Sequence, residues 1–101
     1  MTLPIGVDAP MVATAAAVEA AGTGTMAGTT AGAAGPMSAV VGPGVEEASI
    51  AAATAFAARG AETDAMMTQL TTVRGLFSAT MASSGMAYEA TDLLNQASLI
   101  I

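Results

Sequence analysis

The chain has 101 residues and a formal charge of −6, from eight acidic and two basic residues. So few cations exclude a nucleic-acid-binding surface, because phosphate contacts need a basic patch. Hydrophobic residues make up 53% of the chain but aromatic residues only 3%, and the apolar share is mostly alanine with eight methionines. Burial yields roughly 25 cal/mol per Å², so alanine-rich helices gain little from a core of their own. The methionines either fill a small bundle or repack against a second protein.

Enzyme chemistry is not expected from this composition. Histidine, cysteine, lysine and tryptophan are absent, which removes the usual general base, the thiol and amine nucleophiles and the soft metal ligands. The carboxylates pair as Glu46/Glu47, Glu62/Asp64 and Glu89/Asp92. Neighbouring helical residues diverge by about 100°, so Glu46 and Glu47 cannot flank one bond, and Glu62 and Asp64 diverge likewise. No cation, histidine or glycine loop accompanies Glu89 and Asp92. We expect solvated helix faces, with no catalytic, metal-binding or cofactor-binding residue and no small-molecule substrate.

The two arginines are expected to be solvated or to pair within their own helix, as Arg59 can with Glu62 three residues later. No run of about 18 strongly apolar residues indicates a membrane span. The N-terminus lacks the positive charge and the compact apolar stretch of a Sec signal peptide. Export of this protein would need another route.

The first predicted helix spans about residues 9–34, after an extended lead-in over residues 1–7. Asp8 is expected to cap this helix, and Pro10 is tolerated in its first turn. Apolar and small residues recur at steps of four and three, the spacing of one helical face. They are Met11, Ala15, Val18, Gly22, Met26 and Thr29. Four glycines in this segment also allow a flexible loop, and we favour a helix.

A loop over about residues 35–44 follows, bounded by the Gly35-Pro36 and Gly42-Pro43-Gly44 turn signals. A second helix is predicted over about residues 45–83, with two glutamates in its first turn, where negative charge suits the helix dipole. One stripe of this helix follows a seven-residue rhythm, and a second takes over toward the C-terminal half. The first is Ser49, Ala53, Phe56, Gly60, Thr63, Met67 and Leu70, and the second is Met66, Leu70, Val73, Phe77 and Met81.

These elements predict an all-α fold, an antiparallel two-helix hairpin over residues 8–83. A rod of about 38 residues would be roughly 57 Å long, which is excessive for a lone hairpin, so much of its surface is expected to contact another chain. The candidate contacts are Met11, Val18, Met26, Phe56, Met67, Leu70 and Phe77. Ser83-Ser84-Gly85 is predicted to break or kink the helix before a short helical tail over residues 84–101.

The tail holds the most informative pair of residues. Tyr88, the only tyrosine, precedes Asp92 by four residues, so both side chains share one helical face. An acidic residue at this spacing arises by chance about once in eight or nine cases. The pair gains weight from its place after a long helix, in a chain without chemistry elsewhere.

The whole pattern resembles the PE family, the short helical-hairpin proteins that mycobacteria export through type VII (ESX) secretion systems. The resemblance covers nearly all 101 residues and is carried by four segments. They are Pro36-Met37-Ser38-Ala39-Val40-Val41, Glu46-Glu47-Ala48-Ser49, Ala52-Ala53-Thr54-Ala55-Phe56, and Phe77 with Ser84-Gly85-Met86-Ala87-Tyr88-Glu89-Ala90-Thr91-Asp92. The chain departs from the family near the N-terminus, where Asp8-Ala9-Pro10 stands in place of the Pro-Glu pair.

The resemblance implies a non-enzymatic export substrate, paired with a PPE protein in a four-helix bundle. It also implies that Tyr88 and Asp92 form the general Tyr-x-x-x-Asp/Glu secretion motif. The PPE chain would supply the Trp-x-Gly turn of the composite signal, and an EspG-type cytosolic chaperone would hold the PPE chain. The pair would assemble in the cytosol and reach the cell surface or the medium.

Two other readings remain open. One is a self-associating structural protein, such as a homodimeric WXG-type four-helix bundle, against which the missing Trp-x-Gly turn counts. The other is a membrane-active amphipathic hairpin, which the lack of a basic face disfavours.

Overall fold

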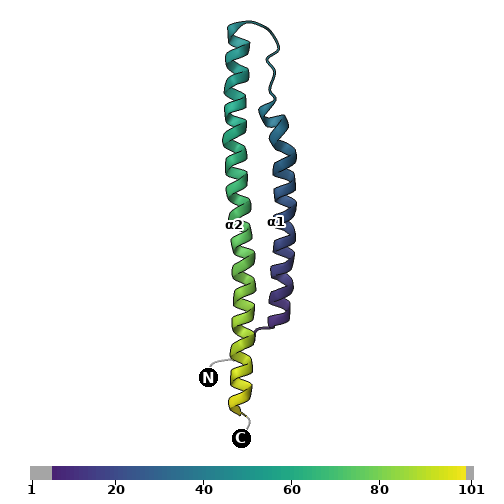
Figure 1. Cartoon of the computed structure of the whole chain (residues 1–101), viewed down its shortest axis with the longest axis vertical. Helices are drawn as coiled ribbons and strands as arrows, with labels where there is room; N and C mark the ends of the chain where they lie inside the picture. The colour runs from purple at the N-terminus through teal and green to yellow at the C-terminus, as the bar shows by residue number, and fades with distance from the viewer. Residues whose placement is uncertain (1–5, 100–101) are drawn as a thin grey trace. The chain divides into compact units, whose positions relative to one another are not determined.

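A computed structural model gives the fold and describes residues 6–99. It contains two helices, α1 (Ala9–Ser38) and α2 (Glu47–Leu99), connected by residues 39–46 (Figure 1). No strand occurs within residues 6–99. The predicted all-helical class and the hairpin of two helices are confirmed.

The contacts within the chain form two units. Among the described residues, unit 1 combines residues 6–22 with residues 74–99, and unit 2 comprises residues 23–73, including the connection between the helices. Each unit therefore pairs one segment of α1 with one segment of α2.

Helix α1 begins as the sequence predicts. The Met11 backbone N–H donates a hydrogen bond to Oδ1 of Asp8 at 3.2 Å, and the Val12 N–H donates to the Asp8 carbonyl at 3.1 Å. Asp8 is thus the N-cap. Pro10 sits in the first turn, where its missing N–H has no helical partner to lose.

Helix α1 ends later than predicted, at Ser38 instead of about residue 34. Pro36 lies within its last turns, so the turn signal at this proline does not stop the helix. The Ala39 N–H donates to the Gly35 carbonyl at 3.0 Å, and the Ser38 hydroxyl donates to the Ala34 carbonyl at 2.9 Å. These bonds satisfy carbonyls of the last turn, which have no partner further along the helix.

Helix α2 also differs from its predicted limits of about 45 and 83. It begins at Glu47 and continues to Leu99. The Ile50 N–H donates a hydrogen bond to the carbonyl of Glu46, the residue before the helix, at 3.1 Å. The predicted break at residues 83–85 is wrong. Gly85 is buried against α1, and a Cβ there would lie 3.1 Å from Cγ1 of Val12. Packing at this close approach offsets the poor helix propensity of glycine.

The core of each unit is built from small residues. In unit 1, Ala9, Ala16 and Ser78 are at least nine-tenths buried, and in unit 2 Thr30 is equally buried. Among the described residues no side chain has less than 2% of its surface exposed. The two helices of each unit therefore pack closely without enclosing a large apolar side chain.

In unit 2 the half-buried residues of α2 after Ser49 recur at alternating steps of four and three. They are Ala53, Ala57, Gly60, Asp64, Met67 and Thr71. Three members of the predicted stripe, Phe56, Thr63 and Leu70, are exposed, and each precedes one of these inner residues. Small residues at most of the inner positions let the helices approach, and the larger Phe56 and Leu70 are turned outward.

The closest approach in unit 2 leads to a matched prediction. A Cβ on Gly60 would overlap the backbone carbonyl of Met37, whereas a Cβ on Gly24 would meet nothing within 4 Å. Both glycines are helical, so alanine improves helix propensity equally at the two positions, by about 1 kcal/mol. We expect Gly24→Ala to stabilise the protein and Gly60→Ala to destabilise it by about 1–3 kcal/mol net of that gain.

Thermal unfolding followed by circular dichroism measures the difference. Equal stabilisation by the two substitutions would show that α1 does not pack against the backbone of α2 at this position.

Candidate protein-docking surface

The protein exposes more surface than a compact chain of its size. Its accessible area is 7524 Å² for a mass of 9.7 kDa. A compact monomer of this mass is expected to expose about 5,100 Å². The excess exceeds the roughly 800 Å² that each partner buries in a typical protein–protein interface. The large apolar side chains show where this surface lies.

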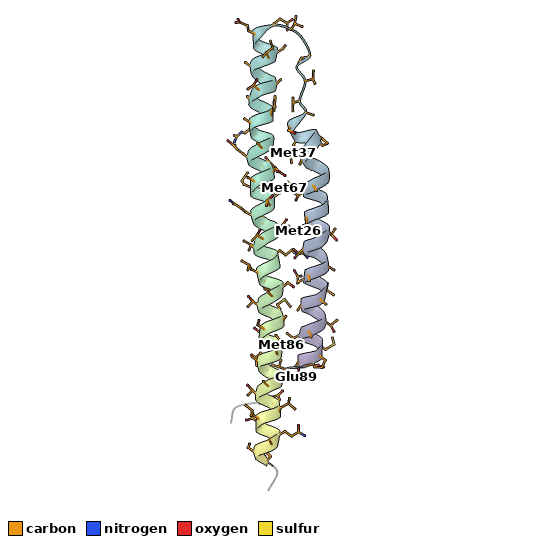
Figure 2. All side chains as sticks on the ribbon, viewed as in Figure 1. Met26, Met37, Met67, Met86 and Glu89 are labelled. Carbon is orange, nitrogen blue, oxygen red and sulfur yellow. The ribbon has the colours of Figure 1, made fainter. Side chains whose placement is uncertain are left out.

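In unit 2 the exposed large apolar side chains lie along α2 and, as Val40, Val41 and Val45, in the connection before it. Phe56 is 65% exposed, Met66 56%, and Leu70 and Val73 are each 61% exposed. Met26 of α1 and Met67 of α2 are half-buried (Figure 2). Residues 66, 70 and 73 are spaced by four and three, so these side chains form one stripe.

In unit 1 the buried Ser78 separates two flanks of α2. Consecutive helical residues diverge by about 100°, so Phe77 and Ala79 project to opposite sides of Ser78. Phe77 is 55% exposed. On α1 of the same unit, Met11 and Val18 are also exposed, at 64% and 63%. Large apolar side chains thus remain uncovered on both helices of unit 1.

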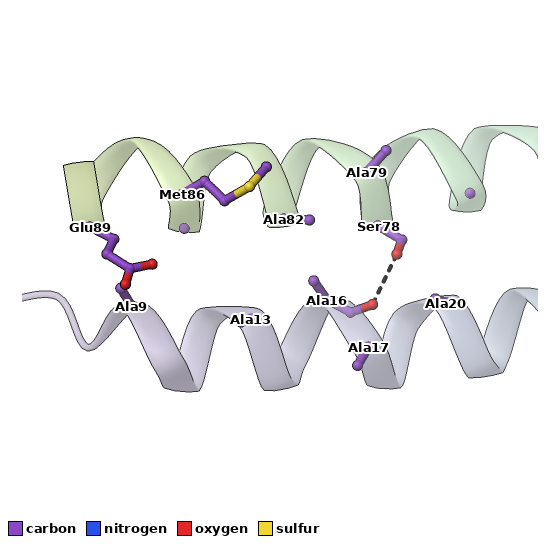
Figure 3. Close-up of a pocket in the computed structure, with 12 residues that line it drawn as sticks. Ala9, Ala13, Ala16, Ala17, Ala20, Ser78, Ala79, Ala82, Met86 and Glu89 are labelled. Atoms are coloured by element: carbon purple, nitrogen blue, oxygen red, sulfur yellow. Dashed lines mark hydrogen bonds between the residues drawn. The ribbon is translucent and has the colours of Figure 1, made fainter. Parts of the chain in front are cut away.

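The flank of Ala79 is a shallow groove lined mainly by alanines. Ala13, Ala17 and Ala20 of α1 face Ala79 and Ala82 of α2 across it (Figure 3). The side chain of Glu89 lies at its end and points toward the start of α1 at Ala9 (Figure 3). Apart from Ser78, whose hydroxyl is bonded to the Ala16 carbonyl, and Glu89 at its end, the lining consists of alanine, glycine and methionine.

The predicted motif residues lie on the uninterrupted part of α2. Tyr88 is 48% exposed, and Asp92 is exposed one turn later. Tyr88 follows Phe77 by eleven residues, about three helical turns, so the two aromatic side chains share a face. A helix packed along this face over Phe77 would reach Tyr88 only by continuing for about three more turns.

Two polar contacts join the helices of unit 1. Nε of Arg74 lies 3.0 Å from Oε2 of Glu19, with the two side chains 35% and 29% exposed. The Ser78 hydroxyl donates to the Ala16 carbonyl at 2.9 Å (Figure 3). The prediction that Arg74 is solvated or paired within its own helix is wrong. A Cβ on Gly22 would overlap the Arg74 guanidinium, so this glycine provides the space that the guanidinium occupies.

Apart from the half-buried Asp64, the other charged side chains of the described residues lie on exposed surface. Arg59 pairs with Glu62 at 3.1 Å within α2, as predicted. The pKa of Glu46 is lowered by a hydrogen bond from its own backbone N–H and by another from the Ser49 hydroxyl, at 3.0 Å. Because this pKa is lower in the folded chain, the ionised Glu46 carboxylate stabilises the start of α2. That contribution is present above its ordinary pKa and is lost as pH falls through the lowered value.

The described part of the chain holds neither a metal-binding cluster nor a membrane-spanning stretch. Within residues 6–99, no group of three or more histidine, cysteine or acidic side chains could hold a metal ion. Neither helix, over those same residues, has a stretch apolar and long enough to cross a membrane.

The seven predicted partner contacts separate into two classes. Met11, Val18, Phe56, Leu70 and Phe77 are exposed, and Met26 and Met67 are half-buried. Their contact with a second chain remains a prediction. Sequence reasoning missed the Glu19–Arg74 pair and the Ser78 contact. The signal in the sequence for these contacts between the helices was the recurrence of small and polar residues along each helix at alternating steps of three and four.

The family model described as PE family matches residues 5–95. Neither a curated protein nor a solved structure matches the chain.

The two arginines provide a matched test of the contact between the helices. We expect Arg74→Met to destabilise the protein by about 1–2 kcal/mol, between the values for exposed and buried ion pairs, because the half-buried Glu19 loses its partner. Arg59→Met removes a pair whose side chains are 81% and 62% exposed and should change stability by less than about 0.5 kcal/mol. Urea unfolding measures both, and equal effects would contradict a special role for Arg74.

Proposed function

The chain belongs to the PE family, and from this premise we propose that it is a substrate of an ESX type VII secretion system, exported as an obligate heterodimer with a PPE-family protein. Family membership supports a non-enzymatic helical protein that is secreted or surface-associated. The PPE partner and the secretion motif are the specific content of the proposal.

One observation carries the pairing: the large apolar side chains are outside the hairpin. Phe56, Leu70 and Phe77 are each more than half exposed, while the buried positions hold alanine, serine, threonine and glycine. Uncovered apolar stripes on two adjacent helices suit packing against a second helical hairpin, which would complete a four-helix bundle. The seven candidate contact residues supply that face.

The motif supports the export part of the proposal. Tyr88 and Asp92 are exposed on one face of α2, which also carries Phe77. A PPE chain packed on Phe77 and continuing along this face for about three more turns would stand beside Tyr88, where its Trp-x-Gly turn would complete the signal. An EspG-type chaperone would hold the PPE chain in the cytosol before export to the surface or the medium.

Pairing is tested by expressing the full chain alone and together with a PPE-family chain. We expect the isolated chain to unfold at a much lower urea concentration than the complex, and the co-expressed chains to form a stable 1:1 complex by light scattering. Within the complex, Leu70→Glu should weaken pairing at least tenfold, since burying an unpaired charge in an interface costs about 1.4 kcal/mol or more. Gln69→Glu adds the same charge one residue earlier and is the control.

Three results would contradict pairing. A monomer as stable as the complex would remove the need for a partner, a homodimer would favour the WXG-like alternative, and unchanged affinity in Leu70→Glu would remove Leu70 from the interface.

Export is tested separately from pairing. We expect Tyr88→Ala and Asp92→Ala each to abolish secretion of the complex into culture filtrate, because both side chains are read as one signal. Pairing should persist in both variants, and Thr91→Ala, which changes the residue between them, is the control. Normal secretion of Tyr88→Ala and Asp92→Ala would refute the motif assignment.

A further inference from the structure

The last turns of α2 extend beyond the part of the helix that contacts α1. Helix α1 starts at Ala9, whose carbonyl lies 3.7 Å from the position of a Cβ on Gly85. Glu89 is the last residue of α2 that lines the groove between the helices. Residues 90–99 are helical and are all exposed.

These turns are amphipathic. Met86, Ala90, Leu93, Leu94 and Ala97 fall on one arc of about 100°, at the spacing i, i+4, i+7, i+8 and i+11. We name this arc the Leu93 face. Its three large side chains are uncovered: Met86 is 64% exposed, Leu93 59% and Leu94 72%.

The Leu93 face and the motif face are on opposite sides of the helix. Asn95 follows Tyr88 by seven residues and therefore shares its face, whereas Leu93 lies about 160° from Asn95. Since Tyr88 also shares a face with Phe77, a partner that covers Phe77 approaches the motif side. The Leu93 face would remain uncovered in the heterodimer.

The charge of these turns indicates what kind of surface would cover them. Residues 86–99 contain Glu89 and Asp92 and no basic residue. The last turn of α2 also has no basic residue among the described ones, so the negative end of the helix dipole has no cation nearby in sequence. A partner with basic residues around an apolar groove would complement both the carboxylates and the dipole.

We propose that the Leu93 face docks as a helix into an apolar groove with a basic rim on a component of the export machinery. The inference rests on the proposed export function and adds a second recognition surface, separate from Tyr88 and Asp92. Anchors at i, i+4 and i+7 or i+8 are the pattern of helices that bind in such grooves. Met86, Ala90, Leu93 and Leu94 provide them.

The experiment uses the full chain co-expressed with its PPE-family partner, and compares Leu93→Glu with Asn95→Glu. Both substitutions add one negative charge at an exposed site of the same helix, on opposite faces. We expect Leu93→Glu to lower secretion at least tenfold and Asn95→Glu to change it less than twofold. Leu93→Met, which keeps the apolar side chain, should be secreted normally. Pairing, measured by light scattering, and helix content should be unchanged in all three.

Each other outcome overturns the inference. Wild-type secretion of Leu93→Glu would mean that the Leu93 face is not read. Loss of pairing in that variant would place Leu93 in the heterodimer interface, and equal loss of secretion in Asn95→Glu would indicate an effect of charge alone. If the wild-type chain itself is neither paired nor secreted, the proposed function fails, and this inference fails with it.

Discussion

The close approach of the two helix backbones is the constraint on which the other features depend. Gly60 lies against the Met37 carbonyl in unit 2, and the Ser78 hydroxyl reaches the Ala16 carbonyl in unit 1. Neither contact leaves room for a leucine or a phenylalanine between the helices. The large apolar side chains are therefore displaced outward, and the surface that invites a partner is a direct result of the small residues inside.

Polar groups contribute to this packing without becoming unsatisfied. The hydroxyls of Thr30 and Thr71 donate to carbonyls one turn earlier in their own helices, each at 2.9 Å. Threonine can thus occupy an inner position at little cost, because its hydroxyl proton is already bonded. The Glu19–Arg74 pair and the Ser78 bond instead cross between helices, and they favour one register of α1 against α2 in unit 1.

The sequence was sufficient for features that are local. The Asp8 cap, the two helices and the Arg59–Glu62 pair depend on residues three or four apart, and the structure confirms each. The pairing of Arg74 with a residue 55 positions away is not a local feature, and nothing near Arg74 in sequence predicts it.

The side of α2 that faces α1 was not predictable either, because hydrophobicity favours Phe56 over Ala57 as an inner residue. The close approach to α1 reverses that preference. The continuation through Gly85 has the same origin: local propensity predicts a break, and contact with Val12 preserves the helix. Of the seven candidate contacts, five are exposed and Met26 and Met67 are half-buried, and their contact with a second chain stays a prediction.

The position of Arg74 between the helices has an electrostatic consequence for how copies of this protein meet. Arg74, one of the two arginines of the protein, pairs with Glu19 between the helices, and Arg59 pairs with Glu62 on the surface. The field around the molecule is accordingly that of a strongly anionic chain, with a formal charge of −6. Two identical chains repel each other before their apolar stripes touch, whereas a chain of opposite charge is attracted over a distance of about a Debye length. This repulsion thus disfavours association of two identical chains relative to association with an oppositely charged chain, a distinction that the apolar stripes alone cannot make.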